Sequence, residues 1–225
     1  MSKLVWDKTG ERYYETGTKK CVLYPQDASG AYPLGVAWNG ITAFNETPSG
    51  AEPTPLYADD IKYVVMMSAE EYGYTIEAYT YPDEFEQCNG AAEVVEGMHV
   101  GQQPRKSFGL AIVTTLGNDV AMNEYGYKLH LIYNSLASPS EKGYATINDS
   151  PEAITMSWEC TTTPVNMTGF KPTASITIDS TKVNKEKLTS LEAILYGTDD
   201  AEPRLPLPDE VAELLGFVKE EEATV

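Results

Sequence analysis

The sequence predicts a mainly β protein: an antiparallel β-sandwich or β-barrel core flanked by one α-helix, with a second short helix towards the C-terminus. Three observations predict this fold class. Several short segments alternate apolar and polar side chains, which is typical of strands with one buried face. Turn-forming Gly, Pro and Asn residues separate these segments. Only two stretches have a helical pattern, so we expect the helices to pack on a sheet.

Six segments are interpreted as strands. Residues 62–67 are apolar and β-branched, whereas in the other five segments alternate residues share an apolar face. Those faces are Tyr74, Ile76 and Ala78; Phe108, Leu110, Ile112 and Thr114; Tyr127, Leu129, Leu131 and Tyr133; Ile154, Met156, Trp158 and Cys160; and Ala174, Ile176 and Ile178. Half-polar strands of this kind indicate antiparallel sheets.

The dipeptide Asn39-Gly40 is the strongest short hairpin signal in the chain. It lies between two apolar runs, residues 36–38 and 41–44. A type I′ turn needs positive φ at both central residues, a conformation that Asn and Gly tolerate. We therefore expect a β-hairpin here.

Residues 45–57 contain three prolines and one glycine, so they predict a long exposed loop and neither a central strand nor a helix. This loop is our candidate for contact with a neighbouring subunit, although a plain surface loop fits the sequence equally well. Its members are Asn45, Glu46, Thr47, Pro48, Ser49, Gly50, Ala51, Glu52, Pro53, Thr54, Pro55, Leu56 and Tyr57.

The helices have recognisable ends. Asn184 suits the N-cap of a helix that runs to Tyr196, and Gly197 suits its C-terminal end. Its apolar stripe is Leu188, Leu191, Ile194 and Leu195. A second helix is expected from Pro208, in the first turn, to Gly216. Residues 82–88 predict one short helical turn.

Three regions follow from these patterns. Residues 1–35 are polar and turn-rich and predict an N-terminal arm or loop. Residues 36–200 predict the β-sandwich domain, including the helix at 184–196. Residues 201–225 predict a stiff Pro-rich connector, the short second helix and a disordered acidic tail, KEEEATV.

The charge of the chain is strongly negative, −18 at pH 7. From Glu46 to Glu96 there are twelve acidic residues and one basic residue, Lys62, which leaves this segment at −11. Such a surface repels phosphate, so it argues against a protein that grips nucleic acid. It does not argue against a surface along which nucleic acid slides.

Cysteine and histidine usage excludes several classes of site. The three cysteines, Cys21, Cys88 and Cys160, are odd in number and far apart, and the chain has only two histidines. A disulfide framework and a zinc site are therefore not expected, and the thiols fit synthesis in a reducing compartment. The N-terminus has no apolar core of signal-peptide length, and no apolar run approaches the ~18 residues of a membrane span.

The sequence carries no recognisable catalytic motif. His130 lies within a strand and His99 in a Gly-flanked loop, and neither accompanies a nucleophile signature. Acid pairs such as Asp59-Asp60 and Glu70-Glu71 are expected by chance in so acidic a chain. Nucleotide-binding and calcium-loop patterns are missing. We therefore expect no enzyme activity, cofactor or metal.

Several long sequence motifs resemble one family. They are VAWNGITAFNETPSGAEPTPLYADDIKYVVMMSAEEYGYTIEAYTYPDEF (36–85), MHVGQQPRKSFGL (98–110), SPSEKGYATINDSPEAITMSWECTTTPV (138–165), TGFKPTASITIDSTKV (168–183) and LEAILYGTDDAEPRLPLPDEV (191–211). Across residues 20–212 the chain resembles the major tail proteins, or tail-tube proteins, of long non-contractile-tailed phages and prophages of Gram-positive bacteria.

This resemblance implies a tail-tube fold and a structural role in the virion. It implies hexameric rings that stack into a hollow tube, made in the bacterial host cytoplasm around a tape-measure protein with the help of tail chaperones. Tail terminator and distal tail proteins are implied at the tube ends. DNA would pass through the lumen during ejection without specific binding, and no cofactor or membrane is implied.

An acidic lining would let DNA pass without sticking, because it repels phosphate over a Debye length of about 8 Å. Glu77 and Glu159 are our candidate channel-facing acids, since each lies on the polar side of an amphipathic strand. Positions on the outer surface fit equally well. The tyrosines Tyr72, Tyr74, Tyr79 and Tyr81 are candidates either for an interface or for sheet packing.

Two other function classes stay open on sequence alone. A carbohydrate-binding β-sandwich used for adhesion would stack sugars on exposed Trp and Tyr side chains. A hydrolase would use one of the acid pairs.

Overall fold

The structure, a computed structural model, describes residues 3–147, 149 and 153–217. It is mainly β, with 46% of residues in strands and 11% in helices, which confirms the predicted fold class. The large antiparallel sheet curls on itself and, over the described residues, does not close into a barrel. Among the residues that the structure describes, no helix is long and apolar enough to cross a bilayer.

Eight strands make the main sheet, in the order β2-β1-β11-β12-β13-β8-β3, and β14 pairs with part of β12. They are β1 (Tyr13–Pro25), β2 (Val36–Trp38), β3 (Ile41–Glu46), β8 (Gly73–Ala78), β11 (Phe108–Asn118), β12 (Met122–Ala137), β13 (Met156–Thr162) and β14 (Ser175–Asp179). All five predicted strands among them are present, with small shifts at the ends. The alternation is confirmed in β8, β13 and β14, whereas β11 is buried over most of its length.

The concave face of the curled sheet encloses an apolar core. It draws buried side chains from β1, β2, β8, β11, β12 and β13. An aromatic cluster lies at its centre, around Phe85 of a 3-10 turn (Asp83–Phe85) that fits the predicted helical turn. The Phe85 ring centroid lies 4.5 Å from that of Trp38 and 5.2 Å from that of Trp158.

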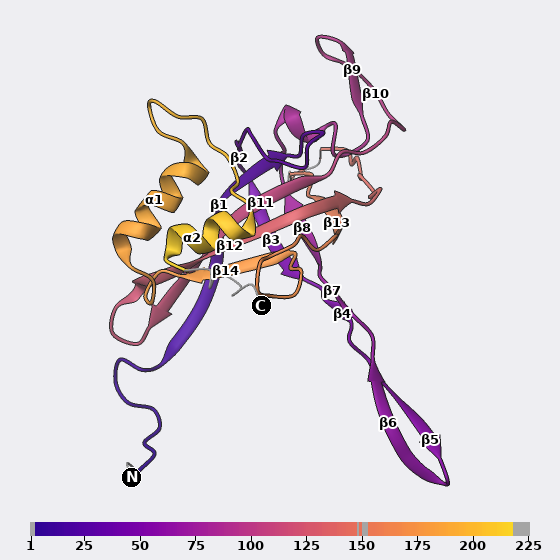
Figure 1. The fold of residues 1–225 in the computed structure, drawn as a ribbon. Helices are drawn as coiled ribbons and strands as arrows, with labels where there is room; N and C mark the ends of the chain where they lie inside the picture. Colours follow the sequence, from indigo (N-terminus) through magenta and orange to yellow (C-terminus); the bar gives the residue numbers. More distant parts are fainter. Residues whose placement is uncertain (1–2, 148, 150–152, 218–225) are drawn as a thin grey trace, which may run out of the picture.

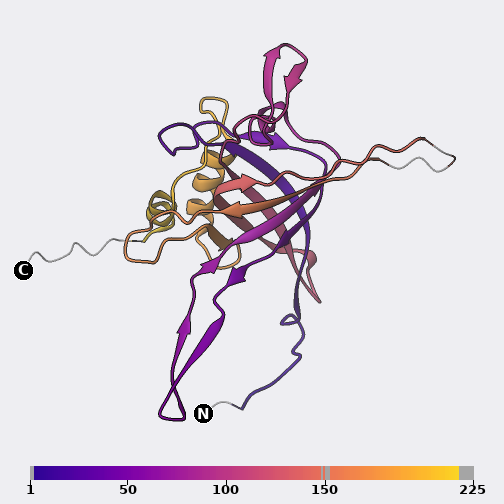
Figure 2. The same cartoon turned by 90° about the vertical axis from the view of Figure 1, so that its right-hand side faces the viewer.

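The convex face of β1, β11, β12 and β14 packs under two helices, α1 (Lys185–Tyr196) and α2 (Pro208–Leu215), as Figure 2 shows. Both predicted helices are confirmed. The Asn184 side chain caps α1 by accepting from the amides of Glu186 and Lys187, and Pro208 opens α2. Burying both sheet faces explains why β11 has an almost continuous apolar sequence.

Buried tyrosines fasten the helical layer to the sheet. The Tyr24 hydroxyl donates to the carbonyl of Leu195 at 2.7 Å, and the Tyr133 hydroxyl donates to the carbonyl of Pro206 at 3.0 Å. Burial raises the pKa of both phenols, so both remain protonated donors. The first bond holds α1 against the sheet, and the second holds the predicted Pro-rich connector against it.

The predicted hairpin at Asn39-Gly40 is wrong. Strand β2 pairs with β1, while β3 pairs with β8, so the two strands stand at opposite ends of the sheet order. The dipeptide instead carries the chain from one edge of the curled sheet to the other. Gly40 does adopt positive φ, 79°, and its carbonyl accepts from the amide of Tyr79.

The predicted N-terminal arm is also wrong for residues 13–25. They form β1, which pairs with β11 along most of its length and with β2 on its other side. Only the last residues of β1 are apolar and buried, so most of this strand has no alternating apolar pattern. The division into three regions stays a prediction, and the predicted acidic tail at 219–225 lies outside the described residues.

Two small hairpins leave the body, as Figure 1 shows. One consists of β9 (Ala92–Val95) and β10 (Met98–Val100). The other is longer and continues β3 and β8 outwards through β4 (Ser49–Gly50), β5 (Pro53–Ala58), β6 (Ile61–Met67) and β7 (Glu70–Glu71). In Figures 1 and 2 they project from opposite ends of the molecule.

Candidate subunit interface

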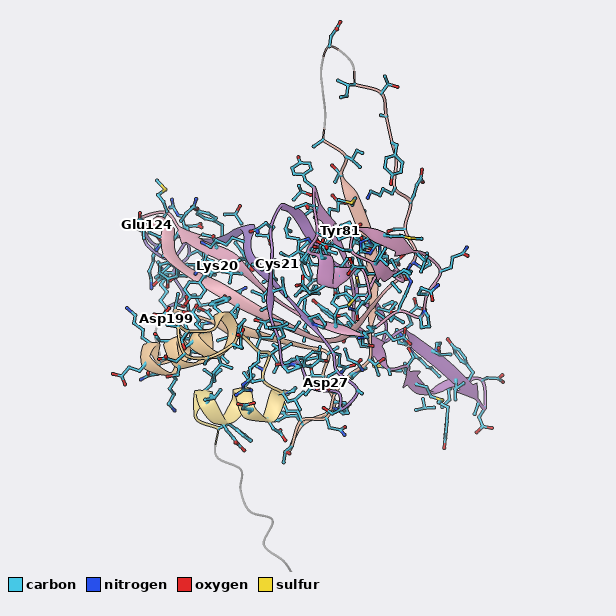
Figure 3. The ribbon with its side chains drawn as sticks, turned by 90° about the horizontal axis from the view of Figure 1, so that it is seen from above. Lys20, Cys21, Asp27, Tyr81, Glu124 and Asp199 are labelled. Atoms are coloured by element: carbon cyan, nitrogen blue, oxygen red, sulfur yellow. The ribbon has the colours of Figure 1, made fainter. Side chains whose placement is uncertain are left out.

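The longer hairpin, residues 49–71, is the candidate functional site, and we call it the arm. Strand β4 pairs with β7, and β5 pairs with β6 from Pro53↔Met67 to Ala58↔Ile61. Figure 3, seen from above, shows the arm leaving the body with no other segment beside it. A two-stranded hairpin of this kind is marginally stable alone.

The tip of the arm is a two-residue turn formed by Asp59 and Asp60. Both have positive φ, 52° and 62°, which is the type I′ geometry that fits a two-residue hairpin. Asp tolerates this region better than most residues, because its short side chain can bond locally. The sequence analysis predicted a turn of this type at Asn39-Gly40 and not here. The sequence signal for the turn at the tip is the Asp pair between residues 53–58 and 61–67.

The neck of the arm depends on Gly50. It has φ 78°, and a Cβ at this position would collide with the carbonyl oxygen of Ala69 on the opposite limb. The next residue, Ala51, also has positive φ, 54°, and its amide donates to the same carbonyl at 3.2 Å. Gly50 therefore lets the two limbs approach closely where the arm leaves the body.

The arm exposes apolar side chains on both of its faces. Every residue of β5 and β6 is exposed, although β6 reads IKYVVMM. Its exposed fractions reach 72% at Tyr63 and 68% at Met67. A near-continuous apolar run is typical of a strand that is buried on both faces. The sequence of β6 therefore fits a covered strand, and nothing in the described part of a single copy covers it.

The predicted loop 45–57 is corrected by this geometry. It is the outgoing limb of the arm and contains β4 and β5, while its first two residues end β3. Its exposure is as expected, with the exception of the half-buried Ala51. The prolines are accommodated because the arm has only two strands, so Pro53 and Pro55 lie on edge strands. Its role in subunit contact stays a prediction.

The four candidate tyrosines, which lie at the two ends of β8, divide into two groups. Tyr74 is fully buried in the concave core, and Tyr72 and Tyr81 pack against that core. Tyr81, labelled in Figure 3, also donates to Glu86 at 2.9 Å. Tyr79 is 55% exposed. Sheet packing therefore accounts for three of the four candidates, and only Tyr79 is available to a partner.

Glu77 and Glu159 lie on the outer face of the sheet, opposite to the concave core. In β8 and β13 the residues on either side of each acid are buried inwards. Glu77 pairs with Ser157 and with Ala43, and Glu159 pairs with Thr75. The two helices pack on the other half of the outer face. The two acids therefore share one polar surface, and their role in a channel stays a prediction.

A charged cluster closes the concave face where β1 passes β3. Lys128 lies 2.5 Å from Glu15, which also accepts from the Thr114 hydroxyl. His130 Nε2 lies 2.9 Å from the same hydroxyl. Burial lowers the pKa of His130. Burial acts to raise the pKa of Glu15, but the bonds from Lys128 and Thr114 outweigh it and lower that pKa.

This cluster links strands of the sheet through side-chain hydrogen bonds. Its residues come from β1, β11 and β12, and Thr177 of β14 lies 3.3 Å from His130 Nδ1. Within the described residues, no group of three or more His, Cys, Asp or Glu side chains is arranged to hold a metal. The three cysteines are free and buried.

Tryptophan placement bears on the carbohydrate-binding alternative. Trp38 and Trp158 belong to the buried core, with 2% and 3% exposure, so neither offers a face to a sugar ring. Trp6 is 74% exposed and lies outside the helices and strands. Of the three tryptophans, only Trp6 therefore exposes its ring.

No protein-family model matches the chain, and no curated protein matches its sequence. Among solved structures, a chain of the anti-feeding prophage baseplate, a six-fold symmetrised cryo-EM structure, matches 78% of this chain and 97% of its own length, with 9% identity and a TM-score of 0.37. A chain of the PVC sheath-tube complex, an extracellular contractile injection system in the extended state, matches 71% and 88%, with 12% identity and a TM-score of 0.31. Both likenesses are weak.

Proposed function

We propose that this chain is a structural subunit that assembles with copies of itself into a phage-tail-type tube, without catalysis. The observation that carries the proposal is the arm, whose strand β6 is apolar along its length yet exposed on both faces. Burial of apolar surface is the main driving force of association. The resemblance of residues 20–212 to tail-tube proteins supports the same role.

The finer proposal follows that resemblance. Hexameric rings stack into a hollow tube around a tape-measure protein, with chaperones during assembly and with terminator and distal tail proteins at the ends. The chain is then a virion component, and DNA passes through the lumen without specific binding. The net charge of −18 supports a lumen that does not retain a polyanion.

Excision of the arm tests self-assembly. Residues 51–69 are replaced by Asn-Gly, a turn that suits the facing pair Gly50↔Glu70. The body should unfold at the same temperature, because the arm residues of β5 and β6 are exposed and support no core. Tubes seen by negative-stain electron microscopy for the wild type should be absent for the variant. Normal tubes from the excised chain would overturn the proposal.

The channel assignment is tested by changing Glu77→Lys together with Glu159→Lys. If these acids face the lumen, DNA release from virions slows, because the new cations hold phosphate by counterion release. Asp199→Lys with Asp200→Lys is the matched control: it changes the charge equally, on an exposed turn beside α1 where Figure 3 labels Asp199. Equal release rates in the two variants would reject the assignment and leave tube formation untouched.

A further inference from the structure

An apolar groove lies on the helical side of the molecule, between β14, residues 167–173 and α2. Its volume is about 820 Å³. The apolar side chains that line it include Phe170, Ile176, Val183, Val211 and Leu215. Phe170 remains 60% exposed, although its ring contacts that of Phe217 at 5.7 Å. The groove is therefore an open apolar surface, and its lining includes Val211 and Ile178 of the packed core.

One side of the groove is a strand with an unpaired edge. Over the described residues β14 pairs with β12 and with no other strand. The carbonyl of Ala174 and the amide of Ser180 bond to β12, so the antiparallel alternation turns the backbone of Thr177 away from β12. The backbone of Ser175 is already bonded, because the Thr173 hydroxyl donates to its carbonyl and accepts from its amide. The edge therefore presents the backbone of Thr177 next to the apolar side chains that line the groove.

The rim of the groove is slightly basic on a chain of charge −18. Lys171 and Lys182 line it together with one carboxylate, Asp179. Asp179 already accepts from the amide and hydroxyl of Thr181 and lies 3.3 Å from Lys182. An occupant that is apolar and ends in negative charge would match this rim.

The tip of the arm has that chemistry. Asp59 and Asp60 form the turn, and Leu56, Tyr57 and Ile61 beside it are exposed. Two other exposed apolar segments fit less well. The β9–β10 hairpin carries Glu93 but its tip has a single acid, Glu96. The N-terminal segment around Trp6 carries Lys3 and Lys8 beside a single acid, Asp7.

We propose that the tip of the arm of one copy docks in this groove of a second copy. The arm cannot serve its own groove, since Figures 1 and 3 show it pointing away from α2. Tip and groove are different surfaces, so the contact is heterologous and each copy can bind one copy while being bound by another. The inference rests on the proposed self-assembly and names its contact.

Cysteine cross-linking between two differently labelled variants tests the contact. Ala58→Cys places a thiol beside the tip, and Ala212→Cys places one in the groove on α2. The native cysteines are buried and do not compete. A short bis-maleimide should join Ala58→Cys to Ala212→Cys at least roughly tenfold faster than to the control Ala201→Cys, an exposed turn position, because docking raises the local thiol concentration.

Charge changes give a second readout. Lys171→Glu with Lys182→Glu should reduce the cross-link to the level of the control, and so should Asp59→Asn with Asp60→Asn, which keeps residues that tolerate positive φ. Thermal unfolding checks that each variant is folded.

The outcomes separate the two proposals. Tubes without the cross-link would overturn the groove and leave the proposed function standing. The cross-link without tubes would support the contact and overturn the tube. If neither forms, both are wrong. A cross-link that forms equally with Ala201→Cys counts as random collision and rejects the groove.

Discussion

Strands β6 and β8 lie five residues apart in the chain but differ in the burial of their side chains. In β8 every second side chain is buried, and Tyr74, Ile76 and Ala78 have 0% exposure. In β6 every residue is exposed, although six of its seven residues are apolar. The alternation of β8 is typical of a strand that packs on a core with one face only. The unbroken apolar run of β6 is typical of a strand that is buried on both faces, and the described part of a single copy does not bury it.

One alanine substitution in each strand should separate folding from assembly. Ile76→Ala removes a fully buried side chain and should cost about 2–5 kcal/mol, which lowers Tm by roughly 4–20 °C. Val65→Ala should change stability by no more than about 0.5 kcal/mol, because Val65 is exposed. Calorimetry measures the first effect, and the critical concentration for tubes should rise for Val65→Ala. Equal losses of stability would remove the distinction between the strands.

The neck of the arm offers a finer test. Gly50→Ala introduces a Cβ against the carbonyl of Ala69, whereas Gly97→Ala, in the shorter hairpin, has the same sign of φ and no atom within 4 Å. Both changes place Ala in the left-handed region, at about 1–2 kcal/mol. Only Gly50→Ala should displace the limbs of the arm and reduce tube assembly. Sedimentation of the two variants at equal concentration measures the difference; matching profiles would show that the neck geometry is unimportant.

The smallest expected effect is a pH dependence that belongs to the body. Because burial lowers the pKa of His130, its stabilising contribution is present above about pH 6.5 and is lost as the pH falls and the unfolded chain takes up protons. Glu15, whose pKa is also lowered, adds a further loss below about pH 4.5. Tm should therefore fall on acidification, and His130→Gln should flatten the step near pH 6.5.

The arm-excised chain is the control for this prediction. It retains β1, β11, β12 and β14, which hold the cluster, so its Tm should follow pH as that of the full chain does. A different profile would place the titrating groups in the arm.

Patterns of neighbouring residues in the sequence predicted the strands and helices that bury one face against the core. The alternation in β8, β13 and β14 and the cap of α1 follow from side chains next to one another in sequence, which is why they are confirmed. Strand β1 was missed because its first residues are mostly exposed and its pairing with β11 is non-local.

The candidate site was predicted in part. The prolines of residues 45–57 indicated exposure correctly, but Pro53 and Pro55 also concealed β5, because a proline suits an edge strand as well as a loop. The run 62–67 has the pattern of an ordinary strand of the sheet. The sequence signal for its pairing with residues 53–58 is the Asp59-Asp60 turn. The stronger hairpin signal, Asn39-Gly40, joins two strands at opposite ends of the sheet order.

That dipeptide has a mechanical consequence. Three peptide steps separate Trp38 from Ile41, so the last residue of one border strand and the first of the other stay within about 11 Å. The covalent chain therefore keeps the two border strands of the curled sheet close together at this end, in addition to the packing of side chains in the core. A force that pulls β2 and β3 apart would therefore act on the backbone of Asn39 and Gly40 as well as on the side chains of the core.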